Sequence, residues 1–145
     1  MISKYRRLLV WAVFALFSSF ILAACSGSGY GSSGQTVDVN VTATDFKYES
    51  SLTTFKQGVT YHFIVTNKGA VAHDFWIMAP SDSQMTPDQA SKVALVGFTS
   101  DTFAAGATKT VDYTFTKAYP AGSLEIACHA TGHYDSGMHL PITVQ

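Results

Sequence analysis

Hydrophobic and polar residues alternate along much of residues 36–145, which is the pattern of half-buried strands. Three stretches follow this period of two: 37–43, 59–65 and 110–115. The stretch 73–78 is apolar at nearly every position, as expected for a strand in the middle of a sandwich, and 124–128 and 140–144 complete the predicted strands. The pattern therefore predicts a chain built mainly from short strands.

A single helix is predicted over 86–95, because Thr86 can cap it and Pro87 suits the first helical position. Turn residues such as Asn67-Lys68-Gly69 separate the strands. Many short strands at near-regular spacing predict an all-β fold, an antiparallel Greek-key β-sandwich or barrel of about seven to eight strands with one short helix. A domain of about 110 residues is long enough to bury one core.

The first 24 residues have a different pattern. Lys4, Arg6 and Arg7 precede a stretch without charges, 8–22. A basic segment followed by about 15 apolar residues has the length of an export signal and is shorter than the roughly 20 residues of a membrane-spanning helix. We therefore expect residues 1–24 to be a signal peptide.

The signal ends in Leu22-Ala23-Ala24-Cys25, which resembles the lipobox of bacterial lipoproteins. The resemblance implies that Cys25 is lipidated and becomes the new N-terminus, followed by a Gly/Ser-rich tether over 25–35 and the folded domain over 36–145. The protein would then be exported and lipid-anchored at the cell envelope, on the outer face of the cytoplasmic membrane or the periplasmic face of the outer membrane. The alternative is a plain secretory signal or an uncleaved anchor, with Cys25 an incidental thiol.

Composition narrows the function classes. The chain has 145 residues, is 47% hydrophobic and 13% charged, and has a formal net charge of -1, so it is too apolar for disorder and too short for a two-domain enzyme. No polybasic surface for nucleic acid is present. Removal of residues 1–24 leaves six Lys and Arg against ten Asp and Glu, a mildly acidic chain with a formal charge of -4.

If Cys25 carries lipid, Cys128 is the only free thiol, and an unpaired cysteine in an exported protein is expected to be reactive or metal-bound. His133 and Met138 follow it with the spacing Cys-x4-His-x4-Met, so all three lie in one loop between the last two strands. His73, which opens the third strand, is the best candidate for a second imidazole. A thiolate, imidazoles and a thioether together favour copper.

These residues resemble the cupredoxins, the small blue-copper electron-transfer proteins. The strongest match is Cys128-His-Ala-Thr-Gly-His133-Tyr-Asp-Ser-Gly-Met138, with Asn67-Lys-Gly-Ala-Val-Ala-His73-Asp-Phe as the partner segment. The resemblance covers essentially all of 36–145 and implies that His73, Cys128, His133 and Met138 hold one type 1 copper ion. It also suggests a carbonyl contact from Ala72. The alternative is a metal-free sandwich of adhesive or receptor type.

The chain departs from the family pattern at two positions. Thr131 stands where the ligand loop often has Pro, and Asp74 stands where several members have Asn or Ser. An ionised Asp74 can accept but not donate a hydrogen bond, and its charge should lower the reduction potential if the side chain is not turned outward. The neighbouring His129 should point away from the metal. The remaining histidines and methionines, which we expect to be surface or packing residues, are His62, His139, Met78 and Met85.

The predicted function is that of a membrane-anchored type 1 copper protein, expected to be a monomer, that carries single electrons between redox proteins docking near His133. The alternative is a copper-binding protein for buffering, delivery or resistance without redox cycling. We do not expect an enzyme, because copper nitrite reductases and multicopper oxidases need further copper sites and domains. A dinuclear site is also disfavoured, since it requires a second cysteine where Gly132 stands.

Overall fold

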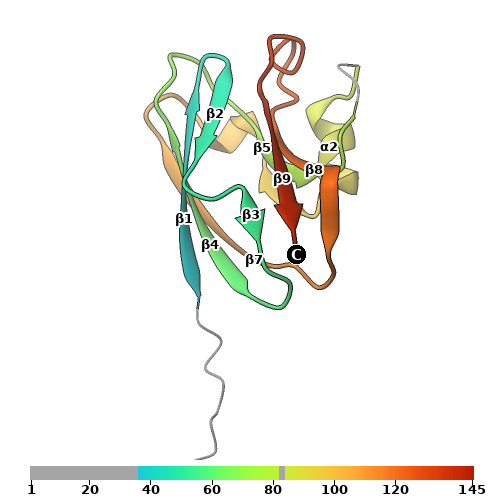
Figure 1. The fold of residues 1–145 in the computed structure, drawn as a ribbon. Coiled ribbons are helices and arrows are strands. Elements are labelled where there is room, and N and C mark those ends of the chain that lie inside the picture. The colour runs from blue at the N-terminus through green and yellow to red at the C-terminus, as the bar shows by residue number, and fades with distance from the viewer. Residues whose placement is uncertain (1–35, 82–83) are drawn as a thin grey trace, which may run out of the picture. The chain divides into compact units, whose positions relative to one another are not determined.

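The computed structural model describes residues 36–81 and 84–145; the expected signal peptide, Cys25 and the tether lie outside them. The described residues form nine strands, one α-helix and one short 3-10 helix (Figure 1). The strands are β1 (Val37–Thr44), β2 (Lys47–Ser50), β3 (Thr54–Phe55), β4 (Thr60–Asn67), β5 (Phe75–Met78), β6 (Val96–Phe98), β7 (Thr108–Thr114), β8 (Tyr119–Ala127) and β9 (His139–Val144). The helices are α2 (Pro87–Val93) and η1 (Ser100–Thr102).

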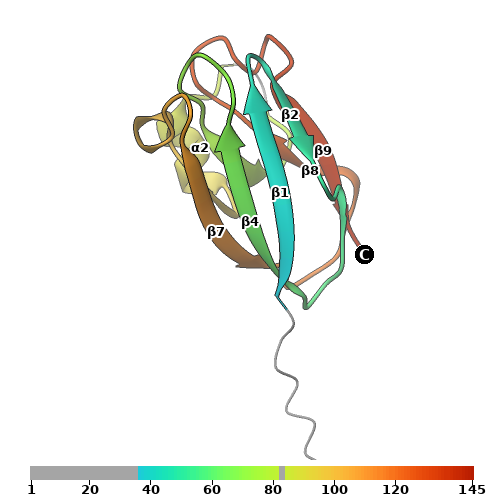
Figure 2. The ribbon, with the colours of Figure 1, turned by 90° about the vertical axis from the view of Figure 1, so that its left-hand side faces the viewer.

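The strands form two sheets that face each other as a sandwich (Figures 1 and 2). One sheet has the order β2-β1-β4-β7 and the other β3-β9-β8-β5-β6. The all-β sandwich predicted from the alternation is therefore confirmed. The expectation of purely antiparallel pairing is wrong, because β1 pairs with β4 and β3 with β9 in parallel. After β2 the chain leaves the first sheet and forms β3 beside β9 in the second sheet. It then re-enters the first sheet as β4, which runs parallel to β1.

The core lies between the sheets and is formed by alternate residues of the strands. In β4, Tyr61, Phe63 and Val65 point inward, while the residues between them are only partly buried. The opposite sheet contributes further buried side chains, including Phe55, Phe75, Ile126 and Ile142, and Phe115, directly after β7, joins the same core. Burying a large apolar side chain contributes roughly 1.5–3 kcal/mol. The apolar residues that recur at every second position of the sequence thus form the inner face of each sheet.

Strand β5 is buried on both faces, which explains its continuous apolar sequence. Phe75 and Ile77 belong to the main core, whereas Trp76 and Met78 pack with Ala90 of α2 in a second cluster. The helix therefore covers the outer face of this sheet. Its predicted start is confirmed: the Gln89 backbone N–H donates to Thr86 Oγ1 (3.3 Å), and the Thr86 N–H donates to Gln89 Oε1 (2.8 Å).

Three strands were not predicted, namely β2, β3 and β6, because segments of two to four residues are too short to display a period. The third predicted strand also begins later than expected, at Phe75, so His73 lies in the preceding loop. Within 36–81 and 84–145, no helix has the length and apolar character needed to span a membrane.

Candidate metal centre

The structure brings together three of the four predicted ligands. One ligand atom from each of His73, Cys128 and His133 lies within 4.8 Å of the other two. The Nδ1 atoms of the two histidines are 3.1 Å apart, and Cys128 Sγ lies 3.3 Å from His133 Nδ1. His73 and Cys128 are fully buried, whereas His133 is partly exposed. The site therefore has a closed inner side and one histidine at the surface.

His73 is held by the loop that follows β4, and the loop is built around the buried Asn67. The Asn67 side-chain amide donates to the carbonyl oxygens of Val71 (2.8 Å) and Phe103 (3.2 Å), and its oxygen accepts from the Gly69 N–H (2.9 Å). The His73 N–H donates to the Phe103 carbonyl (3.3 Å). The position of the imidazole is thus set by backbone groups rather than by strand pairing.

Cys128 and Met138 lie at the two ends of the loop between β8 and β9. The Cys128 N–H donates to the Met138 carbonyl, and the Met138 N–H donates to the His133 carbonyl, each at 3.1 Å. Gly132 has a φ of 79°, which favours glycine directly before His133. Met138 is fully buried in the same core cluster as Cys128. The loop therefore closes on itself, with the fourth predicted ligand at its base.

The donor set fits one copper ion. Donors at about 2.0–2.3 Å from a shared ion must lie roughly 3–4.5 Å apart, as inferred from common metal–nitrogen and metal–sulfur distances, and the measured separations of 3.1 and 3.3 Å agree with this. Thiolate and thioether suit Cu(I), and imidazole suits both oxidation states. A trigonal His2Cys set with a weak sulfur ligand is the arrangement expected of a blue-copper site.

Burial favours the uncharged forms of Cys128 and His133 before a metal binds. Burial raises the pKa of the Cys128 thiol to about 12, although the Asp74 N–H, which donates to Sγ at 3.2 Å, opposes this. Burial, and next the neighbouring His73, lower the pKa of His133. A metal ion must therefore displace the thiol proton, whereas the Nδ1 lone pair of a neutral His133 is available.

Asp74 is buried, so the condition for its predicted effect on the potential is met. Its Oδ1 accepts from the Ser100 N–H at 2.6 Å, while Oδ2 has no hydrogen-bond partner among the described residues. The hydroxyl of Tyr48 donates to the Asp74 carbonyl oxygen. Burial first, and then Cys128 and Asp74, raise the pKa of Tyr48. Polar groups thus surround the segment that donates to the cysteine sulfur.

The turn between β1 and β2 also lies at the site, which the sequence did not predict. Asp45 Oδ1 lies 2.9 Å from His73 Nε2, and the Phe46 ring packs on His133 with centroids 4.6 Å apart. No motif signals these residues, because they precede His73 by 28 and 27 positions in an ordinary strand–turn–strand segment. Only the folded sandwich brings this turn to the ligands.

The other residues singled out in the sequence lie outside the group of three donors. His129 is buried and stacks on Tyr134, which stacks in turn on His139; both pairs of centroids are 4.8 Å apart. Tyr134 and His139 also contact the buried Glu125 carboxylate, at 2.8 and 3.3 Å. His62 pairs with Asp112, and Met78 and Met85 pack in the second cluster.

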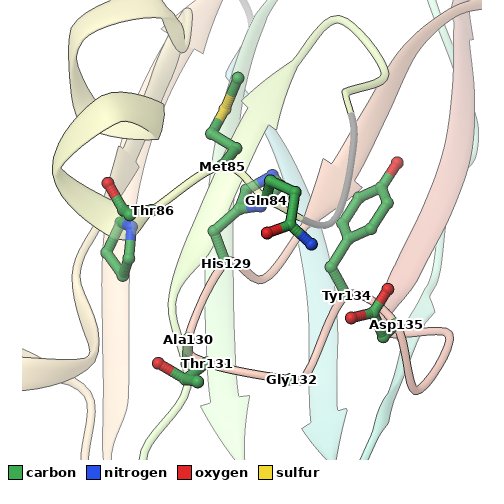
Figure 3. A pocket seen from close by; sticks show the side chains of 10 residues that line it. Gln84, Met85, Thr86, His129, Ala130, Thr131, Gly132, Tyr134 and Asp135 are labelled. Carbon is green, nitrogen blue, oxygen red and sulfur yellow. The ribbon is translucent and has the colours of Figure 1, made fainter.

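A depression of about 330 Å³ lies beside this ring stack on the outside of the ligand loop (Figure 3). His129, Tyr134, Met85 and Gly132 line part of it. His129, directly after Cys128, therefore faces this depression and not the three donors, in agreement with its predicted orientation. The Ala72 carbonyl contact and the effect of Thr131 on loop rigidity stay predictions.

The fold is similar to those of known copper proteins. The copper protein rusticyanin matches with a TM-score of 0.56 and 19% identity over 78% of this chain and 80% of that chain. A structure of rusticyanin from Thiobacillus ferrooxidans gives 0.55 and 21% over 78% and 79%, and reduced auracyanin from the photosynthetic bacterium Roseiflexus castenholzii gives 0.50 and 15% over 76% and 96%. No protein-family model matches the sequence, and no curated protein is significantly similar to it.

The structural match establishes a shared fold, whereas identities of 15–21% do not transfer ligands or activity. The domain described by residues 36–81 and 84–145 therefore has the cupredoxin fold.

Proposed function

We propose that the protein is a type 1 copper protein that carries single electrons, with His73, Cys128, His133 and Met138 as the ligands. The observation that carries this proposal is the convergence of a buried thiol and two imidazole nitrogens within 4.8 Å at one end of a cupredoxin fold. When bound, copper supplies the gain and loss of one electron. The protein's residues supply the geometry, the exclusion of water and the contact with partners.

Rigid placement of the donors supports fast electron transfer. His73 is held by the Asn67 loop, and Cys128, His133 and Met138 are connected by backbone hydrogen bonds that need no metal. A donor set fixed in this way changes little between the two oxidation states. The small rearrangement on electron transfer is what a carrier requires, and the burial of His73, Cys128 and Met138 keeps water away from the site.

His133 is the expected place of exit for the electron. It is the most exposed of the four proposed ligands, and Phe46 beside it is 39% exposed. Val71, on the loop that leads to His73, is 42% exposed. An exposed apolar side chain beside the surface histidine suits short-lived docking of redox proteins, because it contributes contact area without a charge of its own that must be desolvated.

Anchoring through a lipid on Cys25 completes the proposal and rests on the lipobox-like sequence alone. An export signal and a Gly/Ser-rich tether would let the domain meet partners near the envelope membrane. We propose an electron carrier rather than an enzyme, because the four proposed ligands account for a single copper ion and leave no further ligand group of the same kind among residues 36–81 and 84–145.

The test is to load the purified protein with Cu(II), record its visible spectrum and titrate it with a reductant and an oxidant. A strong thiolate-to-copper band that bleaches and returns supports electron transfer. A colourless protein that holds Cu(I) tightly would instead support copper buffering or delivery, and the absence of stoichiometric copper would contradict both functions. Cys128→Ser should lose the band, whereas Cys25→Ser, which removes the other thiol, should keep it.

A further inference from the structure

The Asp45 carboxylate faces the side of His73 opposite to the other donors. Asp45 Oδ1 lies 2.9 Å from His73 Nε2, and Oδ2 accepts from the Ala70 N–H at 2.7 Å. His73 Nδ1, on the other side of the ring, lies 3.1 Å from His133 Nδ1. The two ring nitrogens of His73 thus have separate partners, a carboxylate and the group of donor atoms.

Gly69 leaves the space in which the carboxylate and the imidazole meet. A Cβ atom at this position would lie 2.2 Å from Asp45 Oδ1 and 2.8 Å from His73 Nε2, which is closer than such atoms approach. The φ angle of Gly69 is not in the left-handed region, so backbone conformation does not demand glycine here. The absence of a side chain is instead required by the pairing of Asp45 with His73.

The hydrogen bond determines which nitrogen of His73 carries the proton. The Ala70 N–H donates to Oδ2 of Asp45, which leaves Oδ1 as the acceptor that faces His73 Nε2. An ionised carboxylate can only accept, so Nε2 must donate and carry the proton. A neutral imidazole with its proton on Nε2 has a free lone pair on Nδ1, the atom that faces Cys128 and His133.

We propose that Asp45 is a positioning residue for the metal centre: its carboxylate holds His73 with Nδ1 ready to bind and places one negative charge behind this ligand. This proposal rests on the copper function proposed above. A carboxylate behind a metal-binding histidine makes the ligand more basic and typically strengthens metal binding by about 10–100-fold. The charge stabilises the more positive ion, so Asp45 should favour Cu(II) over Cu(I).

A purely structural role for Asp45 makes a different prediction. Through the Ala70 N–H, the carboxylate also joins the β1–β2 turn to the loop before His73. Loss of that contact alone would lower the stability of the fold and leave the balance between the two copper oxidation states unchanged. The reduction potential therefore separates the two roles.

The first experiment compares the reduction potentials of copper-loaded wild type, Asp45→Asn and Asp112→Asn. Asp112 is the matched control, because its carboxylate also pairs with a histidine, His62, which is not a proposed ligand. For Asp45→Asn we expect the ratio of Cu(II) to Cu(I) affinity to fall about tenfold, a rise of 59 mV in the potential. Asp112→Asn should leave the potential at the wild-type value.

The second experiment uses Gly69→Ala, which keeps the Asp45 charge but leaves no room for the contact. We expect it to weaken Cu(I) and Cu(II) binding about as much as Asp45→Ala does, within the 10–100-fold typical of such partners. The double variant should be no weaker than either single variant, because both remove the same interaction. Additive losses would overturn the assignment of one shared contact.

A third measurement needs no metal. In the ¹⁵N spectrum of the metal-free protein, His73 should show a protonated Nε2 with slow proton exchange, and Asp45→Ala should lose this signature. If wild type binds no copper, the proposed function fails whatever this spectrum shows. If wild type binds copper but Asp45→Asn has an unchanged potential, or the Nε2 proton does not depend on Asp45, the positioning role is wrong and the copper function stands.

Discussion

The ring of Phe46 packs against the imidazole of His133, with centroids 4.6 Å apart and ring planes at 59°. Of the two imidazoles in the donor group, His133 is partly exposed and His73 is buried. The Phe46 side chain, which is 39% exposed, thus covers part of the His133 ring. Aromatic contacts of this kind contribute about 0.5–1.5 kcal/mol beyond the area they bury. The contact fixes the ring of His133 and forms part of the surface on which a partner would dock.

A charge at this position should slow electron exchange between two copies of the protein. Phe46→Lys places a cation on each of two docking faces, and their repulsion should reduce the rate roughly five- to tenfold at low salt, with recovery as salt screens the charges. Line widths in NMR spectra of mixed oxidised and reduced protein measure this rate. Val93→Lys is the matched control, because Val93 is 60% exposed on α2 and the substitution adds the same charge. Equal slowing in both variants would contradict docking at His133.

Met138→Leu should keep the fold and raise the reduction potential. Met138 is fully buried, and Leu has a similar volume, so the loss of stability should stay below about 1.5 kcal/mol. Although a thioether as such suits Cu(I), the trigonal His2Cys set already satisfies Cu(I), whereas Cu(II) gains more from a fourth donor, so removal of the thioether should lower the ratio of Cu(II) to Cu(I) affinity by up to about tenfold, or about 59 mV. Redox titration of the blue band measures the shift. An unchanged potential would exclude Met138 as a ligand.

Asp74→Asn should also raise the potential, for an electrostatic reason. Asparagine retains the oxygen that accepts from the Ser100 N–H, so the local fold should persist. The substitution removes a buried negative charge next to His73 and thereby disfavours Cu(II). The thermal midpoint and the potential should be measured together. A lower thermal midpoint with an unchanged potential would contradict the predicted charge effect.

The metal-free protein should protect Cys128 from alkylation. A thiol with a pKa of about 12 is roughly 0.01% thiolate at pH 8, whereas an ordinary thiol is roughly a quarter thiolate. Because only the thiolate reacts, iodoacetamide should modify folded Cys25→Ser protein at least about 1,000-fold more slowly than the unfolded chain. The rate should rise about tenfold per pH unit up to about pH 12. A plateau near pH 9 would show that burial does not raise this pKa.

Cys25→Ser should release the protein from membranes into the soluble fraction. The prediction rests on the sequence before Cys25, which resembles a lipobox. Fractionation of cells that express either form measures the distribution, and Cys128→Ser is the matched control because it removes the other cysteine. Unchanged membrane association of Cys25→Ser would contradict lipid anchoring.

The sequence predicts those parts of the structure that repeat or cluster along the chain. Alternation of apolar residues located β1, β4 and β7, and the spacing Cys-x4-His-x4-Met located one loop with three of the predicted ligands. The three strands of two to four residues were missed, because they contain at most two repeats of the pattern. Parallel pairing of β1 with β4 was also missed, because it depends on how the chain crosses between the sheets.

The contacts of Asp45 and Phe46 could not be predicted for a related reason. Asp45 is the residue directly after β1, and an aspartate in a turn is common. Its contact with His73 depends on the register of β1 against β4, which pairs Ala43 with Asn67 and so brings the two following turns to the same end of the sheet. A single sequence shows the composition of each turn but not the neighbour that it meets.

Asp45 and Phe46 are adjacent in the chain, and each contacts a different histidine of the donor group. A graft that replaces only residues 128–138 with the loop of another copper protein would consequently leave half of the site's surroundings behind. Such a chimera should keep the contact of Asp45 with His73. It should lose the contact of Phe46 with the imidazole at position 133 if the new loop differs in length. The unit that can be exchanged between proteins of this fold is therefore the pair of the ligand loop and the β1–β2 turn.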